Sequence, residues 1–421
     1  MASRVKQILA HVSGSNDEPP RTKMSEPSIQ VWQSVPLAPP DSIFKLTAAY
    51  KTDTDPRKVN LGVGAYRDDN NKPWILPSIK EANKRLLSDE SLDHEYLPIL
   101  GLPEYTAAAA KLMLSGDSPA IREGRAVSAQ TISGTGANHL GALFLSKFYQ
   151  WNGPPTVYLS NPTWANHHQI FKNVGIQPVE YAYYDPKTIG LDFVGMKEAI
   201  SSAVPRSVFL LHACAHNPTG VDPTPEQWAE LADLFIEKGH YAFFDCAYQG
   251  FASGDLAKDG EASFAKNAGL YGERVGALHV LAATKDEADR VRSQLSILQR
   301  SEISNPPAYG ARLIALLLND EQLLEQWKED IKTMAYRIID MRKQLHHILT
   351  NELQTPGNWD HIVSQIGMFS FTGITPAQAN AIIEKAHVYM TGNGRISMAG
   401  LNSKNIRYFA ESLDKAVRGT L

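Results

Sequence analysis

A single lysine, Lys266, stands among small and aromatic residues in the stretch SFAKNAGLYGERVG, and Arg274 follows it eight residues later. A lysine in a tight, partly apolar setting has a lowered pKa and can act as a nucleophilic amine. Arg274 opens an apolar run, and its guanidinium could bind a phosphate group through two hydrogen bonds. An isolated lysine is usually an ordinary surface residue, so this pair needs support from elsewhere in the chain.

Polar side chains follow three apolar runs that we expect to be strands. Asp245 and Tyr248 belong to FFDCAYQG, Asn217 belongs to HNPTG, and Trp164 and His167 belong to NPTWANHH. Ligands of open α/β sheets bind at the carboxyl ends of the strands, and an acid buried there needs a cationic or hydrogen-bonding partner. Two alternatives stay open: Asp245 could be a structural acid that caps a turn, and Asn217 could be a turn residue.

The motif Ser133, Gly134, Thr135 and a second glycine stands directly before a helical pattern of apolar residues. Free backbone N–H groups and small residues at a helix N-terminus form a ready phosphate site. The motif is not a Walker loop, because the Lys-Ser/Thr pair is absent. A phosphate site, a buried acid, amide and phenol donors, a tryptophan to stack on a ring and an amine together predict a pyridoxal phosphate site.

The bulk composition describes an ordinary globular protein of 421 residues, with 43% hydrophobic and 20% charged residues. A net charge of −4 and a pI near 6.4 argue against a general nucleic-acid binder, which needs a basic face. The longest apolar runs, such as LIALLL, are far shorter than the roughly 20 residues of a membrane span. The chain has two cysteines, Cys214 and Cys246, which suggests a reducing compartment and two buried thiols.

Two other kinds of site fit the sequence less well. His212, Cys214 and His216 alternate, and His167 is followed by a second histidine, but neither arrangement matches a zinc-ligand spacing. We therefore expect no metal site. The tetrapeptide that ends at Lys266 has the Ser-x-x-Lys pattern of penicillin-binding enzymes, but the S-D-N and K-T-G motifs of those enzymes are absent.

The N-terminal stretch ASRVKQILAHV weakly resembles an organellar presequence, but it is short and poor in arginine. Met24 opens the segment that we expect to begin the folded part. We predict a disordered extension over residues 1–27 and a cytoplasmic protein, with a mitochondrial location as the alternative.

From about residue 125, short apolar runs alternate with amphipathic segments, which is typical of an α/β fold with a mostly parallel sheet. The runs at 156–161, 207–213, 241–246 and 274–283 are predicted strands. Between the second and third of them a helix is expected, with Thr224 as its N-cap and Gly239 as its C-terminal stop. A long helical pattern over 321–353 predicts a spine between a large domain, 76–334, and a smaller one formed by 28–75 and 335–421.

Motifs along nearly the whole chain from about residue 28 resemble the aspartate aminotransferase family of fold-type I pyridoxal phosphate enzymes. They are VNLGVGAYRDD, HEYLPILGL, SGTGA, NPTWANH, HNPTG, FFDCAYQGFASGD, SFAKN, GLYGERVGA, SNPPAYGAR and GRISMAGL, in this order. The resemblance is greatest to cytoplasmic fungal members. It implies a large domain with a seven-stranded type of sheet between helices, a smaller α+β domain, and a homodimer with shared active sites.

The resemblance also implies a role for each cofactor residue. Lys266 would bind pyridoxal phosphate covalently and then move the Cα proton of the substrate. Asp245, supported by His167, would pair with the pyridine nitrogen, Asn217 and Tyr248 would bind the phenolate oxygen, and Trp164 would stack on the ring. The phosphate would be held by Ser133, Gly134, Thr135, Ser263 and Arg274, with Tyr96 reaching in from a second subunit.

The implied substrates are dicarboxylic. Arg395 would bind the α-carboxylate, Arg300 of the neighbouring subunit would bind the distal carboxylate, and Gly64 would offer a backbone contact; Trp164 and Asn217 would also touch the substrate. An unpaired arginine in a closed site is costly, so neutral amino acids should be poor substrates. The implied reaction converts L-aspartate and 2-oxoglutarate to oxaloacetate and L-glutamate. An aminotransferase with broader aromatic or neutral substrates is an alternative, against which Arg300 argues.

The chain departs from the family after Asp245, where CAYQGFASGDLAKDGEA leads to Ser263. In the family this interval carries a helix and then an apolar strand that delivers the lysine. Here it has three glycines, no helical periodicity and no β-rich run, although a parallel crossover needs about a dozen residues and a strand about five more. We expect one helix and one strand of the sheet to be missing. An inactive or poorly folded variant of the family is therefore the second alternative.

Overall fold

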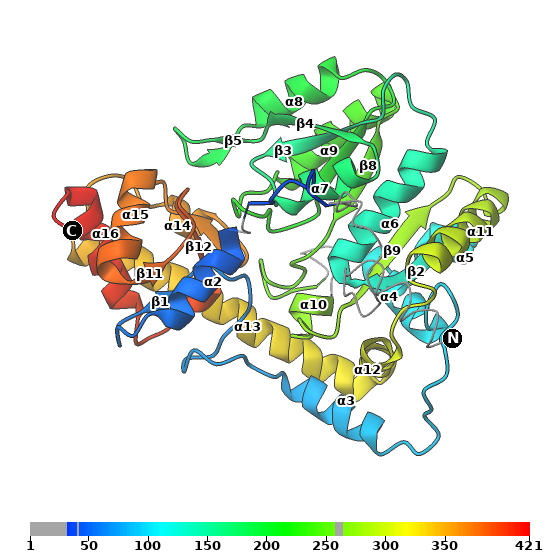
Figure 1. Ribbon diagram of the computed structural model, residues 1–421, viewed down its shortest axis with the longest axis horizontal. Helices are drawn as coiled ribbons and strands as arrows, with labels where there is room; N and C mark the ends of the chain where they lie inside the picture. The colour runs from blue at the N-terminus through cyan, green and yellow to red at the C-terminus, as the bar shows by residue number, and fades with distance from the viewer. Residues whose placement is uncertain (1–31, 40–41, 257–263) are drawn as a thin grey trace, which may run out of the picture. The chain divides into compact units, whose positions relative to one another are not determined.

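The computed structural model describes residues 32–39, 42–256 and 264–421 (Figure 1). Contacts divide the chain into two units, Met1–Asp41 and Ser42–Leu421. In the first unit, residues 32–39 form a turn and an extended stretch with exposed side chains. The predicted extension over residues 1–27 lies outside the described residues. No described helix is long and apolar enough to cross a membrane.

Four parallel strands form the larger sheet of the second unit. Their order is β4 (Gln177–Ala182), β3 (Thr156–Asn161), β7 (Val208–His212) and β8 (Tyr241–Asp245). The strands predicted over 156–161, 207–213 and 241–246 are confirmed to within one residue at each end. Each residue of β7, which has a neighbour on both sides, is buried, as expected for an apolar strand inside a parallel sheet.

Helices cover both faces of this sheet (Figure 1). α6 (Ser133–Phe148) and α7 (Asn166–Asn173) pack on the face that Leu210 presents. α8 (Phe193–Ser202) and α9 (Pro225–Lys238) pack on the opposite face, which carries Phe209. The predicted ends of α9 are confirmed, because Thr224 forms a capping box and Gly239 closes the helix in the left-handed conformation.

A separate two-stranded antiparallel sheet joins β2 (Ala126–Ile132) to β9 (Val275–Leu281). The strand predicted over 274–283 is confirmed, but the expected mostly parallel seven-stranded type of sheet is divided into two pieces in the described part of the chain. Residues 246–256, the described part of the interval after Asp245, contain no helix or strand, in agreement with the predicted loss. They pack against a long helix, since a Cβ on Gly250 would lie 2.5 Å from Ile331.

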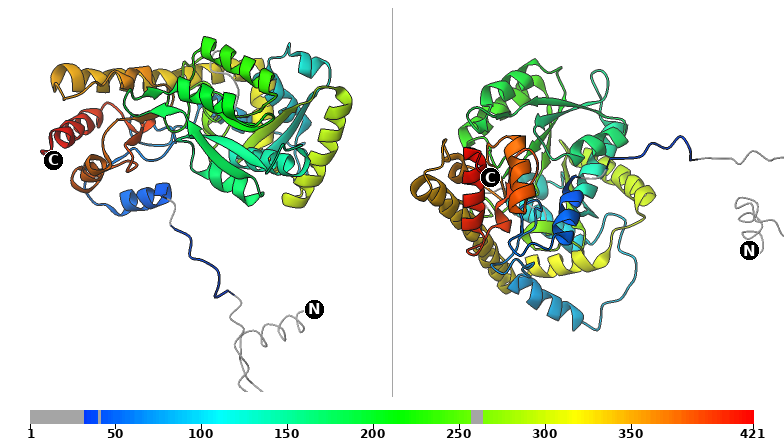
Figure 2. Two further views of the ribbon diagram at one scale, coloured as in Figure 1. Left: turned by 90° about the horizontal axis from the view of Figure 1, so that it is seen from above. Right: turned by 60° about the vertical axis from the view of Figure 1, so that its left-hand side comes forward.

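That long helix, α13 (Glu321–His347), continues into a π-helical turn over Ile348–Glu352 and confirms the predicted spine. Figure 2 shows this helix, in yellow to orange, extending toward the red C-terminal helix α16 (Ile406–Arg418). It contacts α3 (Pro77–Leu87) and α12 (Ala308–Asn319) at one end and α16 at the other. The remaining helices here are α4 (Pro103–Leu114), α5 (Pro119–Arg122), α10 (Phe264–Asn267) and α11 (Lys285–Glu302).

N-terminal and C-terminal segments pair with each other. β1 (Val59–Asn60) lies parallel to β11 (Val388–Tyr389), and β10 (Phe369–Phe371) lies antiparallel to β12 (Arg395–Ser397). α2 (Ser42–Thr52), α14 (His361–Ser364), α15 (Pro376–Ala386) and a 3₁₀ turn over Met398–Gly400 complete this part, and β5 (Tyr184–Asp185) and β6 (Gly190–Leu191) form a separate hairpin. The predicted domain boundaries at 75, 76, 334 and 335 stay a prediction.

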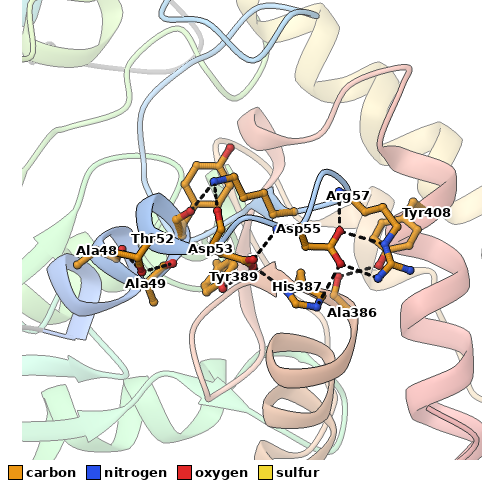
Figure 3. Close-up of polar contacts among 12 residues, drawn as sticks. Ala48, Ala49, Thr52, Asp53, Asp55, Arg57, Ala386, His387, Tyr389 and Tyr408 are labelled. Atoms are coloured by element: carbon orange, nitrogen blue, oxygen red, sulfur yellow. Dashed lines mark hydrogen bonds and ion pairs between the residues drawn. The ribbon is translucent and has the colours of Figure 1, made fainter.

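A polar cluster ties the two segments together (Figure 3). The His387 ring, at the end of α15, lies 2.7 Å from an Asp53 carboxylate oxygen and 3.3 Å from an Asp55 oxygen. Tyr389 donates a hydrogen bond to Asp53, and Arg57 pairs with Asp55 at 2.7 Å. Asp53 follows α2 directly, so the cluster joins the first helix of this unit to the C-terminal part of the chain.

Candidate active site

Lys266 and Tyr248 are in direct contact although the interval between them is short. α10 carries Lys266, whose Nζ donates a hydrogen bond to the Tyr248 hydroxyl and lies 3.7 Å from the centre of the tyrosine ring. Burial lowers the pKa of Lys266 to about 7, and the Asp245 carboxylate opposes this effect. Close to neutral pH the amine is therefore partly unprotonated, as a nucleophile or base must be.

A chain of hydrogen bonds runs behind Asp245, the last residue of β8. His167 Nε2 lies 2.9 Å from Asp245 Oδ2, and His167 Nδ1 lies 2.9 Å from Thr163 Oγ1, which also contacts His212 at 3.2 Å. Burial alone would raise the pKa of Asp245, but the hydrogen bond and charge of His167 lower it to about 2. This outcome favours the ionised carboxylate over the structural turn cap that was the alternative.

Asn217 and Trp164, like Asp245, lie at the carboxyl ends of the parallel strands, in the loops after β7 and β3. Asn217 Nδ2 donates to the Tyr248 hydroxyl at 3.4 Å, while its buried Oδ1 has no partner among the described residues. The Trp164 ring is half-buried and meets the His167 ring edge to face at 5.1 Å. Asn217 is thus more than a turn residue, because its side chain points at the group that contacts Lys266.

The SGTGA motif forms the first turn of α6, which begins at Ser133 itself. No side chain caps this helix N-terminus, and a Cβ on Gly134 would meet nothing within 4 Å. Ser133 N–H donates to the Arg274 carbonyl at 3.0 Å, and both residues have left-handed backbones, with φ of 58° and 52°. Free N–H groups at a helix N-terminus suit a phosphate, and the Arg274 side chain, whose Nη1 donates to the Tyr271 carbonyl at 3.2 Å, could add further donors. The residues present therefore fit the cofactor predicted from the sequence.

Arg395, on β12, forms the other side of the site. Its Nη2 donates to the Gly62 carbonyl at 2.8 Å, while its buried Nε has no partner among the described residues. The guanidinium lies 4.4 Å from the centre of the Phe369 ring, and a Cβ on Gly64 would come within 2.7 Å of the same ring. Burial lowers the pKa of Arg395. A free N–H on a buried guanidinium suits a carboxylate ligand.

Three expected site residues are not assembled here. Tyr96 is 87% exposed, and Arg300 is an exposed residue of α11 whose recorded hydrogen bond goes to Ser304. Both were expected to act from a second subunit, and that expectation stays a prediction. Ser263 lies outside the described residues.

Sequence reasoning missed Phe369, Thr163 and the role of His212. Phe369 touches Arg395, Gly64 and, edge to face at 5.6 Å, Tyr248. Only the three-dimensional contacts reveal it. His212, in contrast, lies next to the end of the strand predicted over 207–213, one crossover away from Asp245, so its position was a usable signal. The described residues contain no group of three or more side chains that could hold a metal ion.

Comparison with known proteins shows which family the chain belongs to. A family model described as aminotransferase class I and II matches residues 56–413. The chain belongs to this family. Enzymes of the family use pyridoxal phosphate, the cofactor that the SGTGA motif, Asp245 and Lys266 predicted from the sequence.

Individual relatives cover nearly the whole chain. The cytoplasmic aspartate aminotransferase of Schizosaccharomyces pombe is 50% identical over 402 residues, which span 92% of this chain and 98% of the relative. The solved structure of the cytoplasmic aspartate aminotransferase of Saccharomyces cerevisiae has a TM-score of 0.89 at 48% identity and covers 93% of this chain and 99% of that one. The fold is therefore that of the fold-type I aminotransferases.

A third relative aligns over more positions than this chain has residues. The cytoplasmic aspartate aminotransferase of Dictyostelium discoideum is 46% identical over an alignment of 438 residues, which spans 100% of this chain and 98% of the relative. Because this chain has 421 residues, that alignment includes positions at which the relative has a residue and this chain has none.

Proposed function

We propose that this chain transfers an amino group reversibly between L-aspartate and 2-oxoglutarate, giving oxaloacetate and L-glutamate. The observation that carries the proposal is the contact of Lys266 with Tyr248 beside Asp245, which is present although residues 246–256, the described part of the interval before the lysine, form no strand. The relatives named above are aspartate aminotransferases, which supports the same reaction and makes an inactive variant the less favoured alternative.

Pyridoxal phosphate would be held by residues from both sheets. The N-terminus of α6 and Arg274 would bind the phosphate, Asp245 would pair with the ring nitrogen, and Asn217 and Tyr248 would face the phenolate oxygen. When bound, the cofactor supplies an electron sink for the carbanion formed at the substrate Cα. An Asp245 held ionised by His167 suits a protonated ring nitrogen, because opposite charges stabilise each other.

Lys266 would move the proton. An amine with a pKa of about 7 exchanges protons readily near neutral pH and can serve both as base and as acid. Tyr248 holds this amine by accepting its hydrogen bond, and burial keeps the pKa of the phenol raised, so that the phenol stays neutral. The amine is thereby fixed on the side of the site that Asp245 and Asn217 share.

Substrate choice would rest on two arginines. The guanidinium of Arg395 would bind the α-carboxylate. Its Nη2 donates to the Gly62 carbonyl, and its Nε has no partner among the described residues. Arg300 is exposed on α11, and we propose that it serves the distal carboxylate in a second copy of the chain, where Tyr96 would also reach the phosphate. This arrangement makes the enzyme a homodimer, and the names of the relatives favour a cytoplasmic location.

The test is cofactor retention by the purified chain. After incubation with pyridoxal phosphate and removal of the free cofactor, borohydride reduction should leave a pyridoxyl label, which peptide mass analysis should locate on Lys266. Lys266→Ala is the matched control and should carry no label. The absorbance of the unreduced protein should change on adding aspartate and much less on adding alanine. A chain that retains no cofactor would remove the proposal of activity and leave the family membership intact.

A further inference from the structure

One edge of β8 has peptide groups that are unpaired among the described residues. Tyr241 N–H donates to the Ser207 carbonyl at 2.9 Å, so the peptide groups of Tyr241 and of every second residue after it face β7. Because peptide groups alternate along a strand, those of Ala242 and Phe244 face the other way. In the described part of the chain, β7 is the strand that pairs with β8, and these two residues have no recorded partner on their own side.

β9 has a matching free edge. Ala282 N–H donates to the Arg125 carbonyl at 3.0 Å, so the even-numbered residues of β9 face β2. The peptide groups of Ala277, His279 and Leu281 therefore point away from β2. Among the described residues, no strand other than β2 pairs with β9.

The two free edges border one cleft. A cavity of about 420 Å³ is lined by all of β8 and by residues 276–281 of β9, and no residue of β2 or β7 lines it. α6 closes one face, since a Cβ on Gly141 would lie 2.6 Å from the Phe243 ring and 3.4 Å from Leu278. Phe244 is 47% exposed and Leu281 is 52% exposed, although β7, with two neighbours, is buried throughout. We call this space the β8–β9 cleft.

We propose that the β8–β9 cleft binds an extended, uncharged peptide segment of another protein as an added strand between the two sheets. An extended backbone supplies alternating donors and acceptors on both of its sides, which suits two facing strand edges. A small apolar molecule would fill the cavity but leave those peptide groups without partners. β8 has five residues and β9 has seven, so we expect the bound segment to be five to seven residues long.

The charges around the cleft determine the side chains it accepts. No lysine or arginine lines the cavity, and its carboxylate, Asp245, is bound to His167. Burial lowers the pKa of His279 to about 4, so this histidine is neutral at pH 7. A charged side chain would lose its hydration here without gaining a partner. Apolar and hydroxyl side chains complement this lining.

A short synthetic strand tests the proposal. The probe is a fluorescently labelled peptide of seven alternating threonines and valines, with blocked ends, added to the full-length chain in buffer with pyridoxal phosphate. We expect saturable binding by fluorescence anisotropy, with slower hydrogen exchange over β8 and β9 and no change over β7. The same peptide with methylated nitrogens along one edge should bind about tenfold more weakly or worse, because it loses hydrogen bonds to one strand.

Substitutions at Ala242 separate the edge from the rest of the fold. Ala242→Pro removes an N–H that faces the cleft and makes no bond to β7, a position at which an edge strand tolerates proline. It should weaken peptide binding by about tenfold while the melting temperature stays near that of the parent. Ala242→Ser keeps the N–H and should bind like the parent. If Ala242→Pro does not fold, Ala277→Pro provides the same test at β9, because the Ala277 N–H also faces the cleft.

Three outcomes would overturn the proposal. One is no saturable binding of the peptide up to millimolar concentration. Another is slow exchange over both free edges in the dilute chain without peptide, which would mean that the chain itself closes the cleft. The third is hydrogen exchange over β8 and β9 that becomes slower as the protein concentration rises, without added peptide. This result would mean that a second copy of the chain occupies the cleft. None of these measurements uses transaminase activity, so failure here leaves the proposed function untouched.

Discussion

At the scale of single residues, the Lys266 amine is held between opposing charges. Burial lowers its pKa to about 7, the Asp245 carboxylate raises it, and the guanidinium groups of Arg395 and Arg274 lower it further. Removing a neighbouring charge should therefore move the pKa in a direction that the sign of the charge fixes. The site is thus testable without any catalytic assay.

We predict opposite shifts in two variants of the cofactor-free chain. Reductive methylation of Lys266, followed by peptide mass analysis over a range of pH, should show a midpoint near 7, whereas surface lysines should show midpoints near 10. Asp245→Asn should lower the midpoint and Arg274→Gln should raise it, each by about one pH unit or less. Shifts of the same sign in both variants would contradict this electrostatic account.

Residue types at strand ends made most of this site predictable from the sequence. Asp245 and Asn217 each follow an apolar run, and the topology of parallel strands brings such positions together. Lys266 lies on α10, outside the parallel sheet, and its place in the site followed from the resemblance of the SFAKN motif. Phe369 was not predictable, because its contacts to Gly64 and Arg395 join segments that are distant in the sequence.

At the scale of elements, the local sequence pattern predicted where strands and helices lie better than it predicted which strands pair with each other. The apolar runs that became β3, β7, β8 and β9 and the caps of α9 follow from periodicity and turn chemistry alone. The pairing of Ile132 with Val275 depends on packing of α6 and α11 around both strands, which no local pattern encodes. The lack of a helix or strand over the described residues 246–256 was nevertheless predictable, because that stretch is rich in glycine and has no helical or strand periodicity.

The Asp53–Asp55–His387 cluster gives an element-scale prediction about pH (Figure 3). A backbone hydrogen bond and the Tyr389 and His387 contacts lower the pKa of Asp53 to about 2, and Arg57 lowers the pKa of Asp55. A carboxyl whose folded pKa is lowered stabilises the fold above its unfolded pKa, and this contribution is lost as the pH falls from about 4 toward 2.

His387→Asn should lower the melting temperature at pH 7 by about 2–4 °C. Asparagine tolerates the left-handed backbone found at this position, with φ of 54°, so the variant tests the contacts of the imidazole ring with Asp53 and Asp55 and not the backbone. The difference between variant and parent should shrink as the pH approaches 2, where Asp53 binds a proton. Equal differences at pH 7 and at pH 2.5, measured by circular dichroism, would mean that the cluster contributes through packing alone.

At the scale of the whole second unit, the cofactor site lies across the division in the sheet. Asp245 and Asn217 belong to the four-stranded sheet, whereas Arg274 adjoins the β2–β9 pair, and α6 packs on both. A ligand that binds residues of both sheets should stabilise the folded state and should also join the two sheets into one cooperative unit.

Calorimetry should therefore distinguish the loaded chain from the cofactor-free chain. Without cofactor we expect a broad or double unfolding transition, because the two sheets share no strand pairing in the described residues. Pyridoxal phosphate at about 100 times its dissociation constant should add about 2.7 kcal/mol and merge the transitions into one. Inorganic phosphate is the control, since it would contact the α6 N-terminus and Arg274 but not Asp245; it should raise the first transition without merging the two. One sharp transition in the cofactor-free chain would show instead that α6 and α13 already couple the sheets.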